Sequence, residues 1–94
     1  MKLVTIEAKF SQTDALKARE IFEKQSLFVR QMAGCLTYEL YTGMAGEVGI
    51  IQKWQTQDAF DAYRSSDTFA VLGNELKPLM TEPPITTVAE INGG

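Results

Sequence analysis

The order in which strand-like and helix-like patterns follow one another most constrains the fold of this chain. Residues 2–10 alternate between the two sides of an extended chain, which predicts a half-buried strand. The chain from Ser11 to about Met32 then reads as a helix, with Ser11 as its cap. Its apolar stripe comprises Ala18, Ile21, Phe22, Phe28, Val29 and Met32, with Leu16 and Leu27 on the opposite side.

The second part of the chain continues with two strands, two short helices and a last strand. Strands are predicted over 35–42 and 48–54, joined by a hairpin turn at Gly-Met-Ala-Gly-Glu. Helices are predicted over 57–65 and about 68–80, and a last strand over 85–91. The closing Asn-Gly-Gly is expected to fray.

Local stop and start signals support these boundaries. Thr56 can cap the first short helix, and Ser66 or Asp67 can cap the second. Pro78 is expected to kink or end that helix, and Pro83-Pro84 forces an extended lead-in to the last strand. The resulting order, βαββαβ, predicts one domain over residues 1–94 of the α+β class. Its expected fold is ferredoxin-like, a four-stranded antiparallel sheet with helices on one face.

Strict alternation along the four strands separates two faces of the sheet. The face expected beneath the helices collects Val4, Ile6, Ala8, Phe10, Leu36, Tyr38, Leu40, Val48, Ile50, Trp54, Ile85, Ala89 and Ile91. The opposite face collects Leu3, Thr5, Glu7, Cys35, Thr37, Glu39, Tyr41, Ile51, Lys53, Val88 and Glu90. This second face is too apolar for water and too charged for a core, so we expect the sheet of a second copy to cover it. The alternative is a monomer with a mixed surface.

Composition narrows the possible functions. The net charge of −3 and the lack of a basic cluster argue against nucleic-acid and anionic-membrane partners, and the N-terminus resembles neither a signal peptide nor a membrane span. The single cysteine, Cys35, fits a cytoplasmic location. The chain has no histidine, which removes the usual neutral-pH base and the commonest metal and haem ligand. The sequence also contains no CxxC, HExxH, GxGxxG or P-loop pattern, so we expect no metal site and no cofactor.

A few polar groups fall on the face predicted to lie beneath the helices. They are the Tyr38 hydroxyl, the Gln52 amide, the Trp54 indole N–H and Thr87. Buried polar groups need partners, which are either one another and helix ends, or a water or ligand in a cavity. Both explanations stay open at this point.

Three stretches resemble the antibiotic biosynthesis monooxygenase family. They are VTIEAKF, GCLTYELY and KWQTQDAFDAYRSSDTF, and the matching elements extend over nearly the whole chain. The resemblance implies a ferredoxin-like homodimer whose two sheets form a dimeric α/β barrel. It also implies a ligand cavity between helices and sheet in each subunit. Better-known members oxidise polycyclic phenols or quinols with molecular oxygen, without flavin, haem or metal.

The resemblance also suggests site residues. Trp54 matches the family's tryptophan at the end of the third strand, and Phe60 a bulky apolar position. Tyr63 and Asp67 fall where members of the family have histidines, so both imidazole positions differ. The implied catalytic set is Trp54, which stacks on a flat ring, Tyr63, which bonds a substrate oxygen, and Asp67 as the nearest base. The implied substrate-binding set is Tyr38, Gln52, Phe60, Phe69 and Leu72.

Each candidate also has a structural interpretation. Trp54 and Phe60 could be ordinary core, Tyr63 a lid over the core, and Asp67 a helix cap. Arg64 is expected to point away from Tyr63 into solvent. Cys35 is expected to act as a small buried hydrophobe, since no base activates it.

Three functions follow in order of preference. The first is a cofactor-independent monooxygenase that oxidises a quinol or polyphenol with O2. The second is a non-catalytic small-molecule binder or stress-associated dimer with the same fold. The third is haem degradation, for which Tyr63 or Cys35 would have to replace the proximal histidine.

Overall fold

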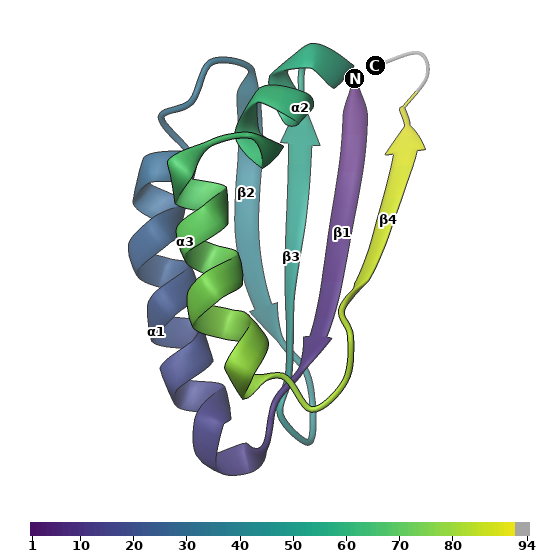
Figure 1. Cartoon of the computed structure of the whole chain (residues 1–94). Coiled ribbons are helices and arrows are strands. Elements are labelled where there is room, and N and C mark those ends of the chain that lie inside the picture. Colours follow the sequence, from purple (N-terminus) through teal and green to yellow (C-terminus); the bar gives the residue numbers. More distant parts are fainter. Residues whose placement is uncertain (92–94) are drawn as a thin grey trace.

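The computed structural model describes residues 1–91 (Figure 1). The strands pair antiparallel in the order β2-β3-β1-β4, which is the predicted ferredoxin-like α+β arrangement. The closing Asn-Gly-Gly, expected to fray, lies outside the described residues. The elements are β1 (Lys2–Lys9), α1 (Gln12–Val29), β2 (Cys35–Thr42), β3 (Glu47–Trp54), α2 (Gln57–Arg64), α3 (Asp67–Leu76), the 3₁₀ turn η1 (Lys77–Leu79) and β4 (Ile85–Glu90).

Side-chain caps begin the helices where the sequence predicts. Ser11, Thr56 and Ser66 each accept a hydrogen bond from the backbone N–H three residues later, at 3.2, 3.1 and 3.2 Å. Ser66 is thus the cap of α3, and Asp67 is the first residue of that helix. Pro78 lies in η1, directly after α3, as expected for a residue that ends a helix.

Gly34 carries the chain from α1 into β2. Its φ of +82° lies in the left-handed region, and a Cβ there would lie 2.5 Å from the Cβ of Ala59 in α2. Glycine is therefore required both by the backbone and by the close approach of α2. The helix before it ends at Val29, earlier than the predicted end near Met32.

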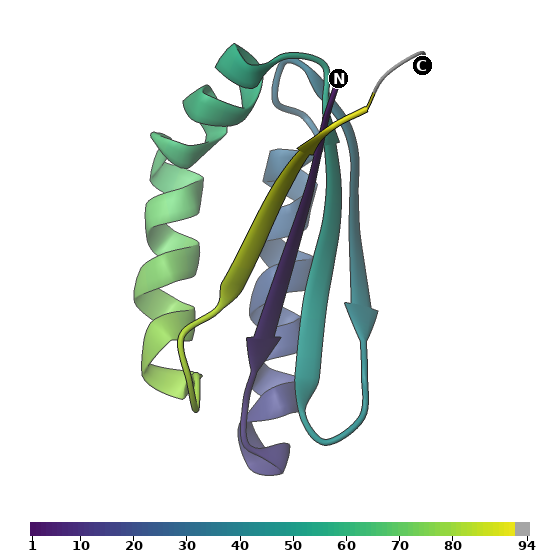
Figure 2. The same cartoon turned by 90° about the vertical axis from the view of Figure 1, so that its right-hand side faces the viewer.

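The helices cover one face of the sheet. α1 and α3 run side by side on that face, and α2 lies across the end of the sheet at which β3 ends (Figure 1). In the view turned by 90°, the β4 edge of the sheet faces the viewer, and α3 lies to one side of it (Figure 2). The covered face holds the core residues Val4, Ala8, Tyr38, Val48, Ile50 and Trp54, all at most 3% exposed.

The stripe of α1 differs from the prediction at one turn. Ala18, Phe22 and Val29 are buried as expected, but Phe28 is 55% exposed, so its assignment to the stripe was wrong. Ser26 is buried at this turn instead of Phe28. Its hydroxyl donates a hydrogen bond to the Glu23 carbonyl at 2.7 Å. A hydroxyl that bonds within its own helix can be buried without another partner, which the apolar pattern alone does not indicate.

The predicted orientation of β4 was also wrong. Val4 pairs with Val88 and Ile6 with Thr86, and directly paired residues share a face. Val88 therefore lies on the helix side, whereas Ile85 and Ala89 lie on the open side. A shift of one residue in register moves every side chain of a strand to the other face of the sheet. The two adjacent threonines of β4 make its alternation of apolar and polar residues weak.

A β-bulge at the start of β2 reverses two further assignments. Cys35 pairs with Trp54 and Thr37 with Lys53, so Leu36 is the extra residue. Cys35 consequently packs against the core, and Leu36 is 47% exposed. Strict alternation had placed these two residues on the opposite faces.

The face of the sheet away from the helices is uncovered within the described chain. Its large apolar side chains include Tyr41, Ile51 and Ile85, which are 38%, 40% and 59% exposed. Charged residues such as Glu39 lie among them on the same face. This mixed surface is the one for which the sequence predicts a partner sheet.

Candidate functional site

A pocket of about 250 Å³ opens between α3 and the β1–β4 side of the sheet. Its lining includes Leu72, Gly73 and Leu76 of α3 and Thr86 and Val88 of β4. This volume is below the roughly 300–1,000 Å³ of sites for drug-sized ligands, and it suits one or two fused rings. The lining residues are Ile6, Phe22, Tyr38, Ile50, Phe60, Tyr63, Arg64, Phe69, Leu72, Gly73, Leu76, Lys77, Met80, Pro84, Thr86 and Val88.

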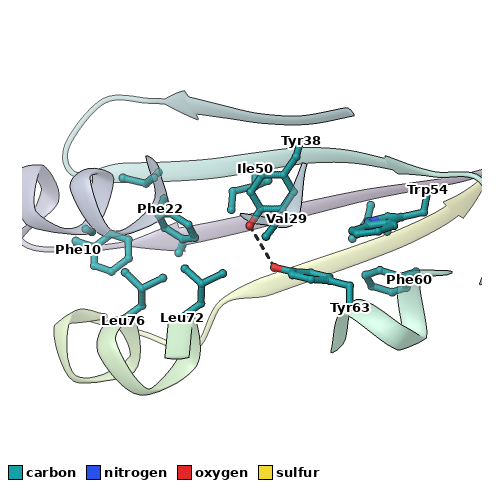
Figure 3. Packing of buried hydrophobic residues seen from close by; sticks show 14 residues of the cluster. Phe10, Phe22, Val29, Tyr38, Ile50, Trp54, Phe60, Tyr63, Leu72 and Leu76 are labelled. Carbon is teal, nitrogen blue, oxygen red and sulfur yellow. Dashed lines mark hydrogen bonds between the residues drawn. The ribbon is translucent and has the colours of Figure 1, made fainter. Parts of the chain in front are cut away.

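Two tyrosine hydroxyls meet in the wall of this pocket. Tyr38 projects from β2 and Tyr63 from α2, and their oxygens lie 3.2 Å apart (Figure 3). The two residues are 1% and 2% exposed. One hydrogen bond uses only one of the two hydroxyl protons. Within residues 1–91 neither hydroxyl has another hydrogen-bond partner, so one of the two protons is unused.

Burial raises the pKa of Tyr38 far above its ordinary value of 10.0, and the neighbouring Tyr63 hydroxyl raises it further. Burial also raises the pKa of Tyr63, although its hydrogen bond to Tyr38 acts in the opposite direction. Both groups are therefore neutral at neutral pH. They can donate hydrogen bonds to a ligand but are poor bases.

The Trp54 ring packs against the Tyr63 ring and does not itself line the pocket. The two rings stack with centroids 5.2 Å apart and planes 19° apart. The Trp54 indole N–H donates to Oε1 of Gln52 at 2.8 Å, and both residues are fully buried. This bond fixes the orientation of the amide, whose Nε2 has no partner among the described residues. The stack and the amide together hold the Tyr63 ring in place.

Aromatic side chains from α2 and α3 complete the wall. Phe69 meets the Tyr63 ring edge-on, with centroids 5.3 Å apart and planes at 82°. Phe60 also lines the pocket, and its ring centroid lies 6.3 Å from that of Trp54. Phe60, Tyr63 and Phe69 thus give the pocket an aromatic wall.

The structure divides the predicted site residues into two groups. Tyr38, Phe60, Tyr63, Phe69 and Leu72 meet at the pocket. Trp54 and Gln52 are not among its lining residues and lie behind Tyr63. Asp67 is exposed in the first turn of α3 and also does not line the pocket.

The lining residues that the sequence did not indicate as site residues include Arg64, Gly73 and Lys77. Arg64 is exposed, as expected, but it also borders the pocket, and its guanidinium carbon lies 5.5 Å from the centroid of the Phe60 ring. Phe60 and Arg64 are four residues apart on α2, and that spacing could have indicated the contact.

Gly73 has no structural reason to be glycine. It lies in the interior of α3, where glycine costs up to about 1 kcal/mol of helix stability relative to alanine. A Cβ at this position would meet only Cε of Lys77, at 3.8 Å. The space above Gly73 therefore belongs to the pocket and not to neighbouring side chains.

Cys35 lies outside the pocket lining. Its thiol lies 3.8 Å from the Thr37 carbonyl oxygen, to which it donates, and burial raises its pKa. Residues 1–91 contain no group of three or more acidic, cysteine or histidine side chains that could hold a metal ion. In the same residues no helix is both long and apolar enough to cross a membrane.

The fold and this pocket define a ferredoxin-like α+β protein with an apolar, tyrosine-lined pocket between its helices and its sheet. Residues 1–72 match the model of the antibiotic biosynthesis monooxygenase family. The chain belongs to this family. The search of curated proteins finds no match.

Solved structures share the fold at low sequence identity. An antibiotic biosynthesis monooxygenase superposes with a TM-score of 0.89 at 16% identity, over 97% of this chain and 98% of that one. Rv0793 from Mycobacterium tuberculosis superposes with a TM-score of 0.85 at 23% identity, over 100% and 98%. A conserved protein from Methanosarcina mazei gives 0.89 at 12% identity, over 95% and 90%. These likenesses support the fold alone.

Proposed function

We propose that the protein is a cofactor-independent monooxygenase that oxidises a small quinol or polyphenol with molecular oxygen. The observation that carries the proposal is the buried Tyr38–Tyr63 hydroxyl pair in the wall of an apolar pocket. An oxygen atom of a flat phenolic ring placed there could accept the unused hydroxyl proton. Membership of the monooxygenase family supplies the reaction class.

The reaction needs no electron source other than the substrate. A naphthohydroquinone loses a proton, and its anion passes one electron to O2. The resulting pair combines into a C–O bond, and cleavage of the O–O bond releases water. One oxygen atom stays in a hydroxynaphthoquinone and the other leaves as water, so the substrate supplies all four electrons that O2 accepts.

In this proposal the tyrosine pair binds and stabilises the phenolate oxygen. Phe60, Phe69 and Leu72 hold the ring and exclude water, which strengthens the hydrogen bond to the charged oxygen. Trp54 and Gln52 act as positioning residues through the Tyr63 ring. Asp67 takes no part in this scheme, because it is exposed and does not line the pocket.

A non-catalytic binder of small aromatic molecules is the second candidate. The observation in its favour is that no carboxylate is among the described residues that line the pocket, and that both tyrosines have raised pKa values. No strong base therefore faces the ligand. Under the first proposal deprotonation depends on the acidity of the substrate itself, whereas a binder needs no deprotonation.

The assembly is part of the proposal. We infer a homodimer in which the open faces of two sheets pack together and form an α/β barrel, with residues 1–94 as one domain in each subunit. The exposed apolar side chains of that face, such as Ile51 and Tyr41, support it. A cytoplasmic location and the absence of a cofactor remain predictions from the sequence.

Oxygen uptake with naphthohydroquinone tests the enzyme. The variant Gly73→Leu places a side chain in the pocket without displacing a core residue, since the added Cβ meets only Lys77. Asn74→Leu adds an apolar side chain at the next, exposed position of α3 and is the matched control. We expect uptake above the protein-free rate for the wild type and Asn74→Leu, and a loss of at least about tenfold for Gly73→Leu. Uptake at the protein-free rate by all three proteins would leave the binder as the better account.

A further inference from the structure

The charged side chains that line the pocket are all positive. Arg64 and Lys77 are the only charged residues among the described residues that line it, and neither takes part in an ion pair formed within residues 1–91. The chain as a whole carries a net charge of −3. Two uncompensated cations beside one apolar pocket on an acidic protein create a local positive potential, which favours an anionic ligand.

Arg64 and Lys77 are both exposed, and Arg64 has an aromatic neighbour. The guanidinium of Arg64 lies over the Phe60 ring, 5.5 Å from its centroid, at the end of the pocket where Tyr63 also lies. A cation stacked on an aromatic face keeps its N–H groups free for another partner. Lys77 follows the last residue of α3, with its Cε close to Gly73.

Arg64 and Lys77 lie at the two ends of α3. The helix spans about 15 Å over its ten residues, and Arg64 precedes it at the end of α2 while Lys77 follows it. The Lys77 side chain reaches back toward Gly73, so both cations border the pocket. Arg64 is the better partner for a carboxylate, because its planar guanidinium offers paired N–H donors whereas Lys77 offers a single ammonium.

We propose that the pocket selects aromatic ligands that carry a carboxylate, and that Arg64 binds this group at the rim. The planar fork of a guanidinium matches the two oxygens of a carboxylate, which a neutral substituent of the same shape does not offer. This inference rests on the proposed function, because it specifies the ligand of the same pocket. It narrows the substrate from quinols in general to acidic ones, such as hydroxylated aryl carboxylates.

Calorimetric titration with naphthoate and its neutral isostere naphthamide tests the inference without any oxidation. We expect naphthoate to bind about fivefold more tightly at about 20 mM salt, and this preference to shrink at about 300 mM. Arg64→Gln should abolish the preference. Lys77→Gln should keep most of it, and Lys17→Gln, which makes the same change of charge at an exposed site on α1, should keep all of it.

Equal binding of the acid and the amide by the wild type would overturn the inference. So would a loss in Lys77→Gln or Lys17→Gln as large as that in Arg64→Gln, because the effect would then be one of overall charge. Selective binding of naphthoate without oxygen uptake from naphthohydroquinone would leave the inference standing and count against the monooxygenase. If neither probe binds, both the ligand pocket and the selection fail.

Discussion

The hydroxyl oxygens of Tyr38 and Tyr63 lie 3.2 Å apart and link β2 to α2 beneath the protein surface. Removing one hydroxyl leaves the other buried without its partner, at a cost of about 1–3 kcal/mol. Removing both leaves no orphaned group. We therefore expect Tyr38→Phe/Tyr63→Phe to lower the free energy of unfolding by less than the sum of the two single variants. Urea unfolding of all four proteins measures this, and a purely additive result would show that the pair is not coupled.

The same pair makes stability depend on pH in the alkaline range. Burial raises the pKa of both hydroxyls above the ordinary value of 10.0, so the folded protein keeps protons that the unfolded chain releases. This contribution is fully present below about pH 10 and is lost as pH rises through the folded-state values. The free energy of unfolding should fall above about pH 10, by up to about 1.4 kcal/mol per pH unit for each tyrosine.

The double phenylalanine variant is the control for this pH dependence. It keeps the exposed Tyr41 and all lysines, so only the contribution of the buried pair is removed. Its stability should fall less steeply between about pH 10 and pH 11 than that of the wild type. Equal slopes for the two proteins would mean that the pair titrates as it does in the unfolded chain.

Gln52 gives the third prediction. Its Oε1 is the acceptor for the buried Trp54 indole, while its Nε2 has no partner in the described part of the chain. Gln52→Met removes that acceptor and orphans the indole N–H, so we expect a loss of about 1–2 kcal/mol. Gln57→Met, at an exposed site where the amide donates to Asp61, should cost less than about 0.5 kcal/mol. Thermal unfolding of the two variants makes the comparison, and equal losses would contradict it.

The fourth prediction concerns the proposed dimer. Ile51 is 40% exposed on the open face of the sheet, and Leu27 is 59% exposed on α1. A lysine at an apolar dimer interface buries an unpaired charge, whereas a lysine on the helix surface stays in water. Sedimentation at micromolar concentration should show dimers for the wild type and Leu27→Lys, and single chains for Ile51→Lys. A wild type that sediments as a single chain would remove the dimer from the account.

Periodicity and caps predicted most of the fold because they are local signals. Ser11, Thr56 and Ser66 act within one turn of helix, and the alternation of β1 is strong enough to fix its own orientation. The bulge at Leu36 and the register of β4 depend on pairing with other strands. Neither leaves a clear mark in the strand's own sequence.

The sequence predicted those site residues for which the family resemblance and the predicted order of elements point to the same place in the fold. Tyr63, Phe60 and Tyr38 meet at the pocket from two elements that the predicted order already brings together. The separation of Trp54 from the pocket was not predictable, because it depends on how the Tyr63 ring stacks over the indole. The i,i+4 spacing of Phe60 and Arg64 on α2 can indicate their contact, but not that Arg64 borders the pocket, which depends on how α2 packs against the sheet.

The central claim is that the pocket beside the Tyr38–Tyr63 pair transfers one atom of O2 to a quinol. Mass spectrometry of the product formed from naphthohydroquinone under heavy-isotope oxygen gas tests it most directly. We predict hydroxynaphthoquinone that carries one heavy oxygen atom, formed faster by the wild type than by Gly73→Leu or by buffer. A product without the label, or the plain quinone with peroxide at the protein-free rate, would contradict the account.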